Sequence, residues 1–163
     1  MKKLIVAILA IMLMACAMGA MAQRIDHRAF TITPSLCYTY MLSSDVRSDC
    51  GNPFGIIVDF EWQNCPIGIE AGYLWSKKDG VKHSYIPILA SYYDFINEQT
   101  YWKVAPGIVT SKHDGDKNTK FAFEIGFGAY LNSDFNVELD YVYYNKLEDT
   151  KFHGIQASVG YTF

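Results

Sequence analysis

The sequence predicts an all-β fold, an eight-stranded antiparallel transmembrane β-barrel preceded by a cleavable signal peptide. Three observations support this prediction. Apolar and polar residues alternate with a period of two through eight consecutive segments, as in β-strands with two different faces. The more polar face is rich in glycine and serine instead of long charged side chains. The only long apolar run stands at the N-terminus, the place of an export signal.

Composition places the chain among ordered proteins and excludes one class of partner. The 163 residues are 50% hydrophobic, 15% aromatic and 19% charged, too apolar and aromatic for a disordered chain. The formal net charge is −3, so no basic field is present to attract nucleic acid. The length suits one domain with a targeting segment. We predict a signal peptide over 1–22 and a barrel over 23–163.

The N-terminal segment has the three parts of a secretory signal peptide. Two lysines are followed by an apolar stretch and by small residues at Ala20 and Ala22, which predicts cleavage between Ala22 and Gln23. A retained transmembrane anchor is one alternative, but the apolar stretch is shorter than the ~20 residues that a span requires. Lipid attachment at Cys16 is another, since the residues leading to it resemble a lipobox.

The first four strands are predicted over 30–40, 54–62, 67–75 and 84–93. Each sets bulky apolar residues against small or polar ones on the opposite face. The apolar faces are formed by Phe30, Ile32, Leu36 and Tyr38, by Phe54, Ile56, Val58, Phe60 and Trp62, by Ile67, Ile69, Tyr73 and Trp75, and by Ile86, Ile88, Ala90 and Tyr92. The fourth segment alternates least regularly.

The last four strands are predicted by the same criterion over 102–108, 121–129, 135–143 and 154–163. Their apolar faces are formed by Trp102, Val104 and Ile108, by Phe121, Phe123, Ile125 and Phe127, by Phe135, Val137, Leu139, Tyr141 and Tyr143, and by Ile155, Ala157, Val159, Tyr161 and Phe163. Most of these segments approach the ~9–11 residues that a tilted strand needs to cross a bilayer. No helix is predicted between them.

The connections between these segments alternate in length. Those at 63–66 and 132–134 are tight turns and the one at 94–100 is somewhat longer, whereas 41–53, 76–82, 110–120 and 145–151 are predicted to be longer polar loops. Short turns at one end and longer loops at the other are typical of outer-membrane barrels.

Eight alternating strands also suit a soluble secreted barrel, so the two faces must be assigned. A solvated outer face would be rich in lysine and glutamate, but here the polar face carries Gly68, Gly72, Gly107, Gly126, Gly128, Gly154, Ser158 and Gly160. Glycine weakens a strand, whereas the narrow interior of an eight-stranded barrel has little room for side chains. The aromatic residues near strand ends match the girdles at membrane interfaces. We therefore predict that the apolar face meets lipid.

The C-terminal segment carries a resemblance to a known family. Residues 155–163 alternate apolar side chains through Val159 and Tyr161 and end in Phe163. This segment resembles the terminal signal of outer-membrane β-barrels, and with the eight-strand pattern the chain resembles small OmpA/OmpX-like barrels of the outer membrane protein β-barrel domain type. The resemblance implies a Gram-negative outer membrane, contact with its lipid, and recognition of Val159, Tyr161 and Phe163 by the barrel-assembly machinery. No peptidoglycan-binding domain follows, so an anchoring role is not implied.

Charged side chains on the polar face are the candidate functional residues. They are predicted to form a polar network in the lumen: Asp59, Glu61, Glu70, Lys103, Glu124, Glu138 and Asp140. In a narrow lumen each charge needs a partner or water. The network therefore plugs the barrel in one interpretation and forms an ion or proton path in the other, and its acid excess is notable because Lys103 is the one basic residue placed there.

Catalysis, metal binding and disulfides are not predicted. His83, His113 and His153 fall near the end with longer loops, but no deacylase-type His-x-Ser motif or metal-ligand spacing accompanies them. Cys50 and Cys65 are expected at opposite ends of one strand, too far apart for a disulfide, and Cys37 is expected to be a small buried residue. No cofactor is implied.

The expected function is therefore structural, or an interaction made through loops, by a barrel with a largely plugged lumen. A small-solute or ion pore is the alternative. A lipid-modifying outer-membrane enzyme is the third possibility. The sequence does not identify a loop partner.

Overall fold

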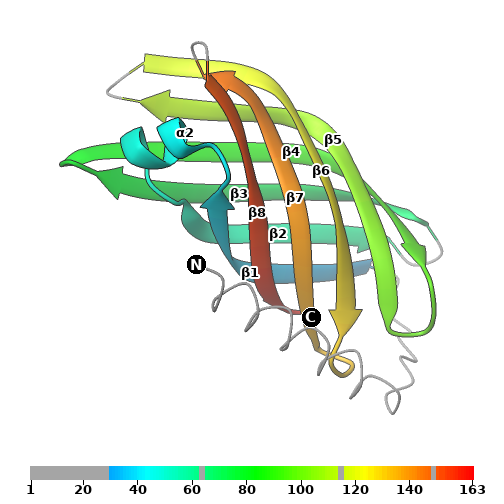
Figure 1. Ribbon diagram of the computed structural model, residues 1–163. Helices are drawn as coiled ribbons and strands as arrows, with labels where there is room; N and C mark the ends of the chain where they lie inside the picture. The colour runs from blue at the N-terminus through cyan, green and yellow to red at the C-terminus, as the bar shows by residue number, and fades with distance from the viewer. Residues whose placement is uncertain (1–29, 63–64, 114–115, 148–149) are drawn as a thin grey trace.

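The computed structural model describes residues 30–62, 65–113, 116–147 and 150–163. Eight antiparallel strands close into one barrel, each paired with its neighbours in sequence and the last with the first (Figure 1). The strands are β1 (Phe30–Met41), β2 (Phe54–Trp62), β3 (Ile67–Lys78), β4 (Val81–Phe95), β5 (Thr100–His113), β6 (Asp116–Tyr130), β7 (Phe135–Leu147) and β8 (Thr150–Tyr161). The predicted eight-stranded barrel is confirmed.

The region before the barrel is not described. The predicted signal peptide, its cleavage site at Ala22 and Gln23, and the alternative lipid-attachment site at Cys16 all lie outside the described residues. Within the described ranges, no helix is long and apolar enough to cross a membrane.

Pairing of β1 with β8 closes the barrel. The ladder runs from Ser35 opposite Gly160 to Met41 opposite Gly154. Just past β8, the backbone N–H of Phe163 donates to the carbonyl of Ile32 at 3.0 Å. Closure satisfies the polar backbone groups that an open sheet edge would leave unpaired in lipid.

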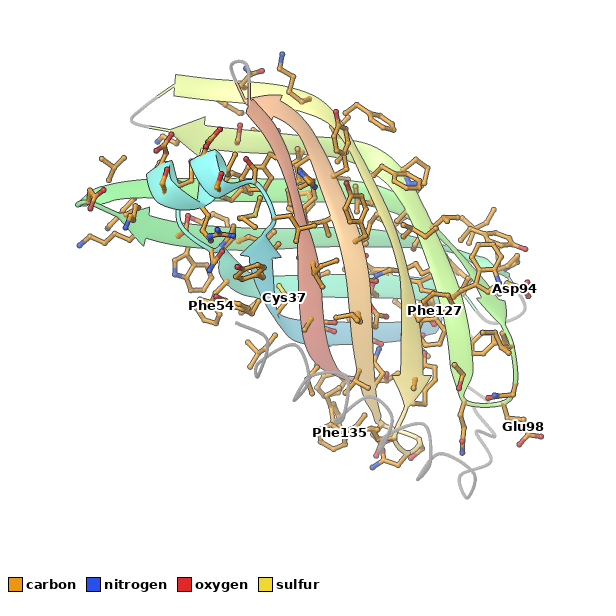
Figure 2. All side chains as sticks on the ribbon, in the orientation of Figure 1. Cys37, Phe54, Asp94, Glu98, Phe127 and Phe135 are labelled. Atoms are coloured by element: carbon orange, nitrogen blue, oxygen red, sulfur yellow. The ribbon has the colours of Figure 1, made fainter. Side chains whose placement is uncertain are left out.

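The outer surface of the wall is apolar and aromatic, as the alternation predicts. Phe54, Phe127 and Phe135 are visible on it in Figure 2 and are 43%, 58% and 44% exposed. The rings of Phe54 and Trp75 lie 4.5 Å apart in an edge-to-face arrangement. Side chains at alternate positions point inward and are buried, so each strand has one lipid-compatible face and one lumen face.

The two ends of the barrel differ. One end, the turn end, holds the start of β1, the chain's C-terminus and the short connections after β2, β4 and β6. Asp94 and Glu98 lie there in Figure 2. The side chains of Asn97 and Asn132 each accept two backbone N–H groups, which fixes the turns after β4 and β6. The other end, the hairpin end, holds the connections after β1, β3, β5 and β7.

The predicted long loops at 76–82, 110–120 and 145–151 are wrong, because strands continue through most of these ranges. Strands β3 and β4 are joined only by Asp79 and Gly80, with φ values of 49° and 86°, the conformation of a type I′ hairpin turn. Residues 117–121 are exposed on both faces. A hairpin that projects into water has polar residues on both faces, so its composition resembles that of a loop although its backbone stays paired.

The first long connection contains a helix that the sequence analysis did not predict, α2 (Ser44–Asp49). At six residues it is too short to show helical periodicity. Val46 is buried, and Arg47 donates to the Tyr40 hydroxyl at 3.0 Å and to the Met41 carbonyl at 2.8 Å. These contacts hold α2 against the hairpin end of the barrel (Figure 1).

The three cysteines of the described chain are free thiols in different surroundings. Cys37 is buried, as predicted, Cys50 is also buried, and Cys65 is exposed at the turn end. Burial at the end of α2 raises the pKa of the Cys50 thiol, which reduces its reactive thiolate at neutral pH.

We expect maleimide to label Cys65 of the detergent-folded protein at least ~10-fold faster than Cys50, because only Cys65 is accessible. Peptide mass spectrometry would measure the two rates. Heat-denatured protein, in which both thiols should react alike, is the control. Equal rates in the folded state would contradict the burial of Cys50.

Candidate functional site

A buried lysine occupies the centre of the lumen. Lys103 projects inward from β5 and is 2% exposed. Its Nζ lies 3.0 Å from Glu70 Oε2, 2.8 Å from Glu124 Oε1, 2.8 Å from Glu138 Oε2 and 3.7 Å from Asp140 Oδ1. We refer to these five residues as the Lys103 cluster.

The Lys103 cluster joins opposite walls of the barrel. Glu70 comes from β3, Glu124 from β6, and Glu138 and Asp140 from β7. In the closed order of eight strands, β3 and β7 stand on opposite sides. The ionic contacts of the Lys103 ammonium therefore reach both the β3 wall and the β7 wall and span the interior of the barrel. Removing one partner of such a buried network is costly, because the remaining charges lose their compensation.

A tyrosine layer seals the turn end of the cluster. Tyr101 donates its hydroxyl proton to Glu138 Oε1, and Asn136 Nδ2 donates to the Tyr101 hydroxyl at 3.2 Å. Tyr93 donates to Asp59 Oδ1 at 3.0 Å. The ring of Tyr101 lies 5.6 Å from that of Tyr93 and 5.5 Å from that of Tyr130. The tyrosine layer therefore links Asp59 to the Lys103 cluster through ring contacts and hydrogen bonds.

An apolar layer fills the lumen between the cluster and α2. It is formed by buried side chains of the barrel strands and of the connection that contains α2: Cys37, Met41, Val46, Cys50, Ile57, Leu74, Tyr85, Leu89, Ala105, Val109, Ala122, Val142, Tyr144 and Phe152. The rings of Tyr85 and Phe152 lie 4.7 Å apart, and Tyr144 stacks on Phe152 at 5.5 Å. The charged cluster is thus bounded by bulky side chains on both sides.

The bulk of these layers differs from the lumen of small residues and charges that the sequence predicted. Glycine provides the space. A Cβ on Gly128 would collide with the Tyr101 ring, and a Cβ on Gly126 would collide with Asp140 Oδ1. The inward glycines therefore admit large or charged side chains from neighbouring strands. Tyr93 already stands in the inward register of the predicted strand 84–93, and Tyr101 and Tyr130 could have been found by extending the predicted strands 102–108 and 121–129 by one residue.

The structure brings together most, but not all, of the predicted lumen residues. Glu70, Lys103, Glu124, Glu138 and Asp140 form one cluster, and Asp59 sits at its edge through Tyr93. Glu61 is only half-buried, near the turn end of β2, and is not among the acids described as paired with Lys103. Position on the inward face therefore does not by itself place a charge in the cluster.

The acid excess persists in the folded barrel. One ammonium faces four carboxylates, and Glu70 Oε1, Glu124 Oε2 and Asp140 Oδ2 have no hydrogen bond within the described chain. Glu124, Glu138 and Asp140 also place three oxygen atoms within 4.8 Å of one another, a spacing that a cation could use. The Lys103 ammonium already stands within 3.7 Å of all three residues and supplies positive charge there.

Comparison with known proteins agrees with this fold. The model of the family described as "Outer membrane protein beta-barrel domain" matches residues 8–163. The chain belongs to this family. The lipid-facing assignment of the apolar face is thereby confirmed over the soluble-barrel alternative, and the protein resides in the Gram-negative outer membrane.

Solved structures similar to this member of the outer membrane β-barrel family share its fold. The N-terminal β-barrel domain of Pseudomonas aeruginosa OprF has a TM-score of 0.66 at 12% identity, covering 82% of this chain and 97% of that domain. Ail of Yersinia pestis has a TM-score of 0.57 at 16% identity, covering 83% and 99%. Neisserial surface protein A has a TM-score of 0.51 at 13% identity, covering 83% and 95%. No curated protein sequence matches the chain.

The C-terminal residues of this family member lie on the outer face, as predicted. Val159, Tyr161 and Phe163 are 53%, 37% and 62% exposed. The rings of Tyr161 and Phe163 lie 4.8 Å apart, and Tyr161 also contacts Phe135 of β7 at 5.0 Å. An aromatic patch therefore marks the end of the last strand. Its recognition by the barrel-assembly machinery stays a prediction.

Two of the three predicted rim histidines, His83 and His153, lie on opposite sides of the barrel wall, whereas the register pairs His113 of β5 with His83 of β4. His83 is 2% exposed and occupies the inward register of β4, not a solvated loop. His153 occupies the outward register of β8, where its Nδ1 lies 3.3 Å from the Tyr141 hydroxyl. His83 thus lies on a strand near the predicted end of the barrel, because β4 begins at Val81, before the predicted start at residue 84.

Proposed function

We propose that this protein is a non-conducting outer-membrane barrel that supports the envelope and displays its hairpin end for interactions. The observation that carries the proposal is the Lys103 cluster, whose contacts join β3 to β6 and β7 across the bore. Eight strands enclose an interior that side chains can fill. The tyrosine layer on one side and the apolar layer on the other support a plugged lumen.

The same geometry supports a role without catalysis. His83 and His153 face opposite sides of the wall, so these two cannot serve one nucleophile together. The register places His113 opposite His83, but His83 is only 2% exposed, which leaves little access for a lipid substrate. The cluster carboxylates are enclosed between two layers of bulky side chains, which keeps a lipid substrate from reaching them. A lipid-modifying activity is accordingly the least supported of the three functions.

A cation or proton path is the second candidate, favoured by one specific observation. Several buried carboxylate oxygens of Glu70, Glu124 and Asp140 lack hydrogen-bond partners within the described chain. Acidic side chains in a pore attract cations. If water enters the lumen, this acid excess would select cations over anions.

Planar-bilayer recording separates the two candidates. We expect the purified full-length protein to give no stable channels, because ion pairs and rings fill the bore. A large porin inserted under the same conditions is the positive control, and a heat-modifiable gel shift shows that the tested barrel is folded. Stable cation-selective conductance from the folded protein would overturn the plugged-lumen proposal and support the pore.

A further inference from the structure

A lysine pair recurs at the same place on three hairpins. The pattern Lys-x-x-x-x-Lys occurs as Lys77 and Lys82, as Lys112 and Lys117, and as Lys146 and Lys151. In each case the two lysines are direct cross-strand partners, two rows from the tip of the hairpin. The strand register thus places the two lysines of each pattern opposite each other on neighbouring strands.

Directly opposed like charges destabilise a pair of strands unless something lies between them. Lys77, Lys82, Lys112 and Lys117 are exposed on the outer face of the wall. Within the described chain, no ion pair joins these four side chains to an acid. An anion placed between the opposed lysines would reduce their repulsion.

Three of these lysines line a groove on the outside of the barrel. The groove has a volume of about 870 Å³, and the outward-facing residues of β3, β4 and β5 in its lining are Tyr73, Trp75, Lys77, Lys82, Ser84 and Lys112. Register places Trp75 beside Ser84 and Ser84 beside Lys112. Strands β3 and β4 extend farther at the hairpin end than β1 and β2, so the groove stands on the projecting part of the wall (Figure 1).

The order of side chains along β3 indicates how far each one lies from the hydrocarbon core of the membrane. Tyr73 and Trp75, 50% and 38% exposed, precede Lys77 on the same face. Two residues of strand correspond to ~7 Å, about the step from the edge of the hydrocarbon to the lipid headgroups. Aromatic rings are typical of the edge of the hydrocarbon. Lysines two residues farther along the strand would therefore lie at the lipid headgroups.

We propose that this groove binds the phosphate of a phosphorylated glycolipid in the outer leaflet. Lys77, Lys82 and Lys112 surround the phosphate, while Trp75 and Tyr73 pack against the sugar and the first acyl carbons. The hairpin end faces outward in this arrangement, as is usual for barrels with short periplasmic turns. Because the phosphate separates Lys77 from Lys82, lipid binding relieves their repulsion.

The charge distribution favours a lipid over a soluble polyanion. The lysines stand directly above aromatic residues on the lipid-facing side, where a membrane phosphate would be held. The tip of the same hairpin carries Asp79, which repels a polyanion that approaches from solution.

The test compares lipids that differ only in phosphate. Full-length protein folded in dodecylmaltoside micelles is titrated with fluorescent bisphosphorylated lipid A and, separately, with its dephosphorylated form. Removal of two lysine contacts in a Lys77→Gln/Lys82→Gln variant should weaken binding of the phosphorylated lipid by about 10- to 30-fold. Binding of the dephosphorylated lipid should be weak and should not change.

A matched control removes the same charge elsewhere on the hairpins. Lys78→Gln/Lys120→Gln, which lie on the opposite register of β3 and β6, should bind like the parent, and Lys77→Arg/Lys82→Arg should retain binding. A heat-modifiable gel shift confirms the fold of each variant. Equal binding of both lipids, or an equal loss in the control variant, would overturn the proposal. Lysine-dependent binding of a soluble sulfated polysaccharide at a higher affinity than the lipid would overturn the choice of occupant.

Discussion

Replacing Lys103 with methionine should strongly destabilise the barrel. Methionine approaches the length of lysine but removes the charge that lies within 3.7 Å of four buried carboxylates. Loss of one partner from a buried ionic network typically costs about 3–5 kcal/mol. We expect a loss of this size in the free energy of unfolding, measured by urea titration of vesicle-inserted protein with tryptophan fluorescence.

Two further variants show whether the loss comes from the cluster. Lys120→Met removes a lysine from the exposed part of β6 and should leave stability nearly unchanged. Adding Glu124→Gln and Glu138→Gln to Lys103→Met removes two of the uncompensated charges and should recover part of the lost stability. An unchanged melting temperature for Lys103→Met in detergent would show that the cluster does not support the fold.

Removal of Phe163 should strongly reduce outer-membrane levels in cells while refolding into detergent stays largely intact. The ring is 62% exposed and contacts Tyr161, and the backbone N–H donates one hydrogen bond to Ile32, so the structural loss on deletion is limited to these contacts. Full interfacial burial of such a ring is worth about 1–3 kcal/mol. If the assembly machinery recognises this residue, its loss prevents insertion more than it weakens the finished barrel. Immunoblots of outer-membrane fractions and gel shifts of refolded protein measure the two effects.

The matched control is Phe135→Ala, which removes another half-exposed aromatic ring at the turn end without changing the C-terminus. Both variants lose one interfacial ring, and the deletion also loses the hydrogen bond to Ile32, so a purely structural role predicts only a modest difference between their levels in cells. Levels of the Phe163 deletion well below those of Phe135→Ala are expected. Normal levels after the deletion would contradict recognition, and failure to refold in vitro would assign Phe163 a structural role.

The alternation of side chains predicts the number of strands and the face that each turns to lipid. It assigns Phe54 and Phe135 outward and Glu70 and Lys103 inward, as the structure confirms. This works because the two faces of a barrel strand meet different surroundings, so period two is imposed on every strand. The same signal fails beyond the membrane, where both faces of the hairpins meet water. The hairpins of β3–β4 and β5–β6 therefore resemble loops in the sequence.

The identity of the inward charges follows from the sequence, but their partners were decided by the tertiary structure. Lys103 is 33 residues from Glu70 and 35 from Glu138 along the chain, and only closure of the barrel brings both carboxylates to its ammonium. Glu61, on the same face as Asp59, remains outside the Lys103 cluster. The lysine pairs of the hairpins likewise became opposed charges through register. Local periodicity reports which surroundings a side chain meets, whereas contact between distant strands depends on the shear and closure of the whole barrel.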